Sequence, residues 1–120
     1  DALLFFSKSF KERYLLSCKY QLKKYIGLDR DKVIDQLLSY NHTWDNYSLS
    51  IMFITIYIKI FKQGMYFNKM FVFFIELLVI NMSPDPKLRL NIDDSLYEYN
   101  KCFYIESDTN NYVNLINHLR

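Results

Sequence analysis

The stretch from Leu49 to Ile58 constrains the fold most, because its apolar residues occur on every side of a helix. They are Leu49, Ile51, Met52, Phe53, Ile54, Ile56, Tyr57 and Ile58. Asp45 lies just before this stretch, and a carboxylate there can accept the unpaired amide hydrogens of a first helical turn. A helix that is apolar all round belongs in the interior of a protein. The sequence therefore predicts a central helix, capped by Asp45, that runs to about Phe61.

The composition favours helices joined by short connections. The chain has 120 residues, of which 51% are hydrophobic and 18% aromatic, so it has enough apolar surface to fold. It contains only 2 glycines and 2 prolines, too few for the frequent turns of a β-sandwich. We therefore expect one all-α domain over residues 1–120, in which residues 106–120 form a peripheral tail.

Other stretches have a helical pattern as well. From Phe10 to Ile26 the apolar residues Tyr14, Leu15, Cys18, Leu22 and Ile26 recur at helical spacing. The lysines between them predict a solvated basic face, with a phosphate-binding patch as the alternative. Gly27 is expected to end this helix, and Asp29 or Asp31 to cap a short one through Leu38. The run from Met70 to Met82 predicts a second buried helix, with Glu76 as its one charge.

A stiff corner follows this apolar run. Pro84 and Pro86 exclude helical geometry for the residues before them, so Ser83 to Asn91 should turn sharply. Asn91 comes just before Ile92, Asp93 and Asp94, and an Asn cap with acids in the first turn is a good helix start. The corner therefore predicts a further helix that begins near Asn91.

Charge and spacing disfavour several kinds of site. A net charge of +2 is too small to predict nucleic-acid binding. Cys18 and Cys102 lack the spacing of metal ligands, and His42 and His118 are each isolated, so we expect neither a metal site nor a catalytic histidine. Lysines and Glu76 interrupt the apolar region, so a membrane span is not expected. The apolar start lacks a basic leader, which favours an intracellular location.

Two stretches together resemble the large lobe of protein kinases. Asp45-Asn46-Tyr47-Ser48-Leu49-Ser50 is similar to the D-x-W-S-x-G stretch that opens the central helix of that lobe, with Tyr47 in place of Trp and Ser50 in place of Gly. Downstream, Asp85-Pro86-x-x-Arg89 and the helix start at Asn91 resemble the D-P-x-x-R stretch and closing helix of the same lobe. The resemblance covers roughly Phe10 to Phe103 and implies the all-α C-terminal half of that lobe.

The resemblance implies structural roles for five residues. Asp45, with Tyr47 and Ser48, would be the structural anchor, in which a buried aspartate accepts hydrogen bonds from the catalytic loop. Arg89 would form the ion pair that the family makes with a glutamate at the end of its activation segment. Glu12 is the only candidate for that glutamate, although it lacks the neighbouring proline, and a surface Arg89 without a fixed partner is an equal alternative.

The catalytic motifs of the family do not occur in this sequence. It has no glycine-rich phosphate loop, no V-A-I-K lysine, no H-R-D-x-x-x-x-N loop and no D-F-G. ATP and Mg²⁺ would therefore bind a part of the domain outside this chain, and we expect no catalytic, cofactor-binding or metal-binding residue here. The sequence leaves open whether the complete kinase-like protein is an active serine/threonine kinase or a pseudokinase.

We interpret the chain as the C-terminal helical portion of a serine/threonine protein-kinase-like domain, whose partner is the remainder of that domain. Its bias toward Asn, Lys, Ile, Tyr and Phe suggests an AT-rich genome. The divergent form of its first motif is similar to the form found in kinases of large DNA viruses. For a viral protein, the expected location is the host cytoplasm or the virion. The alternative is a small helical structural or interaction protein, such as a virion component, whose apolar helices pack on partner chains.

Overall fold

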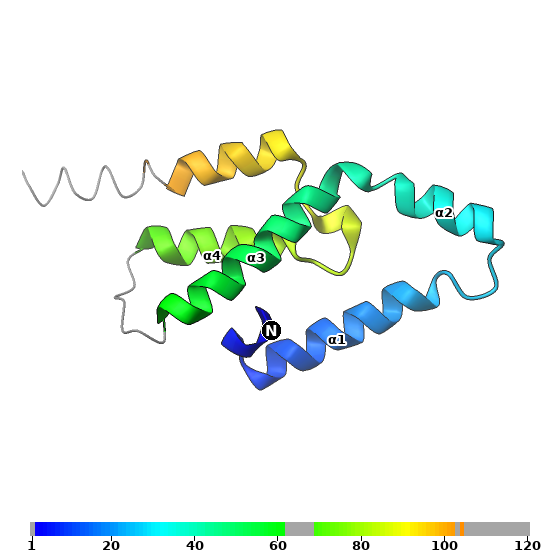
Figure 1. Ribbon diagram of the computed structural model, residues 1–120, viewed down its shortest axis with the longest axis horizontal. Coiled ribbons are helices and arrows are strands. Elements are labelled where there is room, and N and C mark those ends of the chain that lie inside the picture. The colour runs from blue at the N-terminus through cyan, green and yellow to red at the C-terminus, as the bar shows by residue number, and fades with distance from the viewer. Residues whose placement is uncertain (1, 62–68, 103, 105–120) are drawn as a thin grey trace, which may run out of the picture.

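The computed structural model describes residues 2–61, 69–102 and 104, and these residues form an all-helical fold (Figure 1). A short 3₁₀ helix, η1 (Ala2–Phe5), is followed by α1 (Lys8–Lys23) and α2 (Arg30–Leu38). The 3₁₀ helix η2 (Asn41–Thr43) leads directly into α3 (Trp44–Phe61), and α4 (Lys69–Asn81) follows. The 3₁₀ helix η3 (Pro86–Leu88) forms the corner before a last described helix, residues 92–102. The predicted tail, 106–120, lies outside the described residues.

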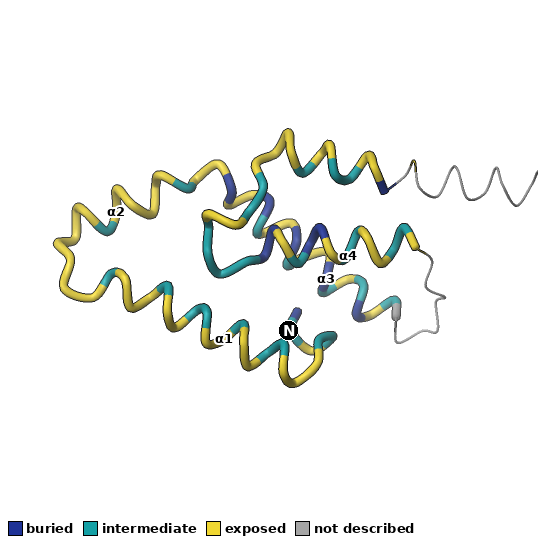
Figure 2. Tube along the Cα trace, turned by 180° about the vertical axis from the view of Figure 1, so that it is seen from behind, coloured by how far each residue is buried: buried dark blue, intermediate teal, exposed yellow. Residues whose placement is uncertain are grey.

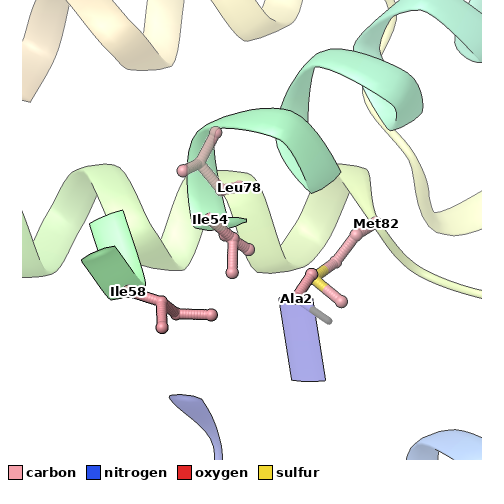
Figure 3. Packing of buried hydrophobic residues seen from close by; sticks show 5 residues of the cluster. All are labelled: Ala2, Ile54, Ile58, Leu78 and Met82. Carbon is pink, nitrogen blue, oxygen red and sulfur yellow. The ribbon is translucent and has the colours of Figure 1, made fainter. Parts of the chain in front are cut away.

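The centre of the molecule is the pair α3 and α4, which lie side by side with η1 against α3. Their contact forms a small core of Ala2, Ile54, Ile58, Leu78 and Met82 (Figure 3). Phe74 of α4 packs edge-on against the rings of Phe53 and Tyr57 of α3, at centroid distances of 5.9 and 5.7 Å. The predicted central helix and the apolar helix after it are thus confirmed as the helices that form the core. The second of them, however, is not buried as predicted, because Val72, Phe73 and Ile80 are exposed.

Helix α3 is less enclosed than its sequence predicts. One face carries Ile54 and Ile58 into the core, but Leu49, Met52 and Ile56 on the opposite side are exposed, and Phe53, which contacts Phe74, is still 36% exposed. The expectation that this helix is buried on all sides is therefore wrong for the chain as it stands. The reason is that, in the described part of the chain, α4, η1 and the helix of residues 92–102 leave this side of α3 uncovered.

Local capping sets several of the helix ends. Ser7 begins α1 by accepting a hydrogen bond from the amide of Phe10, so the helix starts earlier than expected. It also ends earlier, at Lys23, and Gly27 comes after the following turn with the positive φ of 81° that favours glycine. Asp29, one of the two predicted caps, occupies the N-cap position of α2, but its side chain makes no capping hydrogen bond there. Asn91 accepts the amide hydrogen of Asp94 at 2.8 Å, which confirms the predicted helix start there.

The first two α-helices extend away from the core. Neither α1 nor α2 contains a fully buried residue, and both lie at the periphery of the molecule (Figure 2). Helix α1 is attached mainly through Phe10 and Tyr14, whose rings continue a stack that begins at Phe6. The structure thus has a compact centre and a loosely attached arm, which consists of α1 and α2.

Candidate functional site

The two stretches that resemble the kinase motifs lie against each other in the structure. The first forms the start of α3, from Asp45 to Ser50, and the second forms the corner and the helix start from Ser83 to Ser95. They are joined by a ring contact and by hydrogen bonds between residues more than 40 positions apart. This junction is the candidate site.

Tyr47 and Arg89 make the ring contact of the junction. The guanidinium carbon of Arg89 lies 4.4 Å from the centre of the Tyr47 ring, within the range of a cation–π interaction. The Nε of Arg89 donates a hydrogen bond of 2.8 Å to the carbonyl of Ser83, which fixes the guanidinium on the corner. Partial burial lowers the pKa of Arg89, and the nearby Tyr47, Tyr14 and Asp85 oppose that effect. Arg89 stays cationic in any case, because guanidinium groups do not deprotonate in proteins.

A tyrosine of α1 also contacts the junction. The hydroxyl of Tyr14 donates a hydrogen bond of 2.9 Å to the carbonyl of Met82, at the end of α4. Burial is the main cause that raises the pKa of Tyr14, and a side-chain hydrogen bond with Tyr47 raises it further. Tyr14 is therefore a neutral link between the arm and the core.

Three polar side chains connect α3, α4 and the helix of residues 92–102. The amide nitrogens of Asn46 and Asn81 each donate to the hydroxyl oxygen of Ser95 at 3.0 Å. The Asn46 amide also donates to the carbonyl of Leu90 at 2.9 Å, and the Asn81 oxygen accepts the amide hydrogen of Leu90 at 3.1 Å. Asn46 is 9% exposed and Asn81 only 4%. Such buried polar groups must be paired, so this Asn46–Asn81–Ser95 network fixes how the corner sits on the core.

A groove runs from the junction between the arm and the corner. It has a volume of about 480 Å³. Its walls are mostly aromatic rings and prolines, with Arg89 as their cation: Tyr14, Tyr25, Tyr40, Trp44, Tyr47, Pro84 and Pro86. Amphipathic rings of this kind suit protein contacts, because they combine apolar area with hydroxyl groups.

The structure does not pair Glu12 with Arg89, so the expected ion pair is wrong for this chain. Glu12 faces solvent on α1, where its nearest cation is Lys8 at 3.9 Å. Both of these side chains are exposed, so their ion pair contributes little to stability. Arg89 instead uses the Ser83 carbonyl and the Tyr47 ring. The physical reason is that Glu12 lies on the solvent side of α1, whereas Tyr14 lies on the side that faces the corner.

The three predicted anchor residues differ in their surroundings. Asp45 lies in the first turn of α3 and is exposed, and the helix begins one residue earlier, at Trp44, so Asp45 is not the N-cap residue. Tyr47 is half-buried at the junction, and Ser48 is exposed. The buried polar residue of this turn is Asn46. Sequence reasoning missed Asn46, Asn81 and Ser95, although an asparagine inside the apolar run from Met70 to Met82 was a usable signal for a buried hydrogen-bonding group.

Within the described residues, no three histidine, cysteine, aspartate or glutamate side chains come together as metal ligands. No helix of that part of the chain is both long and apolar enough to cross a bilayer. Comparison of the chain with protein-family models, with curated proteins and with solved structures finds no match.

Proposed function

We propose that this chain is the C-terminal helical portion of a serine/threonine protein-kinase-like domain, and that it scaffolds a catalytic loop located outside the chain. The observation that carries the proposal is the junction itself. The two stretches that resemble the kinase motifs were identified separately, yet Tyr47 of the first stacks under Arg89 of the second. Two unrelated chance resemblances have no reason to be neighbours in space.

The geometry of the first turn of α3 suits a scaffolding role. Asn46 and Tyr47 hold this turn to the corner, and Asp45 between Trp44 and Asn46 stays exposed. An exposed carboxylate on a fixed helix start can accept backbone amide hydrogens from a loop that packs against it, and such charge-assisted hydrogen bonds are strong. ATP and Mg²⁺ would bind the part of the domain that supplies this loop. The location that goes with this proposal is intracellular, in the host cytoplasm or the virion if the source is a virus.

The second candidate is a helical interaction protein whose exposed apolar faces pack on partner chains. The observation that favours it is the exposure of apolar side chains on both core helices: Leu49 and Met52 of α3 and Val72 and Ile80 of α4 are each more than 40% exposed. Exposed apolar surface of this extent marks an interface. Both candidates therefore require more protein than this chain, and they differ in what that protein is.

The first experiment is to isolate the polypeptide from its source with an antibody raised against this chain, and to determine its intact mass and N-terminal sequence. The kinase proposal requires an upstream extension that carries the phosphate-binding lysine, the catalytic loop and the magnesium-binding aspartate. A polypeptide without these stretches would rule out phosphoryl transfer and leave the interaction protein.

The second experiment tests the role of Asp45 in that longer polypeptide. Asp45→Asn should speed hydrogen exchange at the catalytic-loop amides and, in an active enzyme, lower kcat by roughly 100-fold through misplacement of the loop. The matched control is Asp35→Asn, which changes an exposed aspartate of α2. The scaffolding role is wrong if the two variants have the same exchange rates in that loop.

A further inference from the structure

The solvent side of α1 has a composition that its predicted role as a solvated basic face does not explain. Leu15 and Leu22 were expected to face inward, but Leu22 is 68% exposed, and Leu16 beside them is 69% exposed. Ile26, just beyond the helix, is 77% exposed. Leaving so much apolar area in water is unfavourable, so we expect this side of the helix to bind another molecule or surface.

Apolar and basic side chains share this side of the helix. Residues three, four and seven positions apart lie above one another, which gives two adjacent rows on α1. We name them together the outer face of α1: Lys8, Leu15, Lys19 and Leu22 in one row, and Glu12, Leu16, Tyr20 and Lys23 in the next. All eight side chains are exposed, and the one acid, Glu12, lies 3.9 Å from Lys8. Helix α1 lies at the periphery of the molecule (Figure 2), and Leu22, at one edge of the outer face, also lines the groove beside Trp44 and Tyr47.

The charge of this segment is strongly positive. Residues 8–24 contain six cations, Lys8, Lys11, Arg13, Lys19, Lys23 and Lys24, against the single acid Glu12, a net charge of +5. The whole chain carries only +2, so the rest of it is net negative. On the outer face itself, Lys8, Lys19 and Lys23 outnumber the one acid, Glu12, so its partner is anionic as well as apolar.

We propose that the outer face of α1 binds an anionic lipid surface peripherally, with α1 lying in the plane of the headgroups. Lysine side chains can place their ammonium groups among lipid phosphates or carboxylates while their methylene stems lie along apolar neighbours. Leucine and tyrosine side chains between them reach the boundary of the acyl region. An acidic protein surface fits less well, because lysine is depleted from the buried centres of protein interfaces and here alternates with leucine throughout.

The test is flotation of the whole chain with lipid vesicles in a density gradient, which separates bound protein from any aggregate because aggregates sink. We expect binding to vesicles of phosphatidylcholine with one-third phosphatidylserine, and much weaker binding to phosphatidylcholine alone. Lys19→Glu with Lys23→Glu should weaken binding to the anionic vesicles by roughly 25-fold or more. Each lysine near an anionic membrane raises the affinity about fivefold, and two lysines are removed. The matched control Lys87→Glu changes an exposed lysine of η3 and should have little effect.

A second variant separates the apolar contribution from simple charge attraction. Leu15→Ser with Leu16→Ser alters only exposed positions outside the groove, so the fold should survive, as circular dichroism would verify. It should reduce binding to the anionic vesicles without changing retention on immobilised polyglutamate. Equal flotation with neutral vesicles, no flotation at all, or a Lys87→Glu effect as large as that of the paired lysine variant would each overturn the proposal. Binding to polyglutamate as tight as to the vesicles, with no effect of the leucine changes, would instead assign the face to an acidic protein.

Discussion

Replacement of Asn81 by alanine tests whether the polar network holds the corner to the core. Asn81 is 4% exposed and takes part in two hydrogen bonds, one to the Ser95 hydroxyl at 3.0 Å and one from the Leu90 amide at 3.1 Å. Each is worth about 1 kcal/mol net, and the Leu90 amide left without its acceptor adds about 1 to 2 kcal/mol. We therefore expect Asn81→Ala to lower the free energy of unfolding by about 3 to 4 kcal/mol.

The assay is urea unfolding followed by far-ultraviolet circular dichroism, with the midpoint and slope compared between variants. Asn100→Ala is the matched control, because Asn100 is an exposed residue of the helix formed by residues 92–102 and its change should shift stability by less than about 0.5 kcal/mol. A loss below about 1 kcal/mol for Asn81→Ala would show that water or other groups replace its hydrogen bonds.

A double-mutant cycle with Ser95→Ala sharpens this test. The Ser95 oxygen accepts hydrogen bonds from both Asn46 and Asn81, so removing it should also destabilise the protein. Because one interaction is shared, the double variant should be at least about 0.5 kcal/mol more stable than the sum of the two single losses predicts. Strictly additive losses would mean that Asn81 and Ser95 act independently.

Two further predictions concern the core and the link to the arm. Ile54→Ala removes a core side chain that is 2% exposed and should cost about 2 to 5 kcal/mol of unfolding free energy, whereas Ile56→Ala on the exposed side of α3 should cost much less. Urea unfolding of the two variants checks this, and equal losses would contradict the assigned core. Burial raises the pKa of Tyr14 in the folded state, so above the ordinary value of 10.0 the unfolded chain loses a proton that the folded chain keeps. Stability should therefore fall as pH rises beyond about 10, and Tyr14→Phe should flatten that fall in a series of unfolding curves; parallel curves would count against it.

The elements that the sequence predicted well are those set by short-range rules. The long apolar runs predicted α3 and α4 to within one or two residues, because runs of more than ten apolar residues are longer than ordinary strands. Asn91 gave the start of the helix after the corner through its own hydrogen bond to Asp94. Pro84 and Pro86 gave the corner itself. Each of these depends on side chains within a few positions of each other.

The features that the sequence did not predict depend on which helix surfaces contact each other in the fold. In α1 the apolar residues occur on more than one side, so spacing alone could not tell that Phe10 and Tyr14 would make the contact and leave Leu22 in solvent. Ala2 lies in the core through η1, although nothing in the first five residues indicates contact with α3. The Ser95 network likewise joins residues 14 and 49 positions apart, and such pairs cannot be matched from one sequence.

The polar network and the exposed apolar surface are also physically connected. A shallow groove of about 200 Å³ is lined by Asn46, Asn81 and Ser95 together with the exposed side chains of Leu49 and Leu96. If further protein packs into this groove, it excludes water from the hydrogen bonds of the network and raises the cost of leaving any one of them unmade. Asn81→Ala should then cost more in the longer polypeptide than in this chain alone. An equal cost in the two would mean that the groove stays open to water, and that the protein which covers α3 and α4 does so elsewhere.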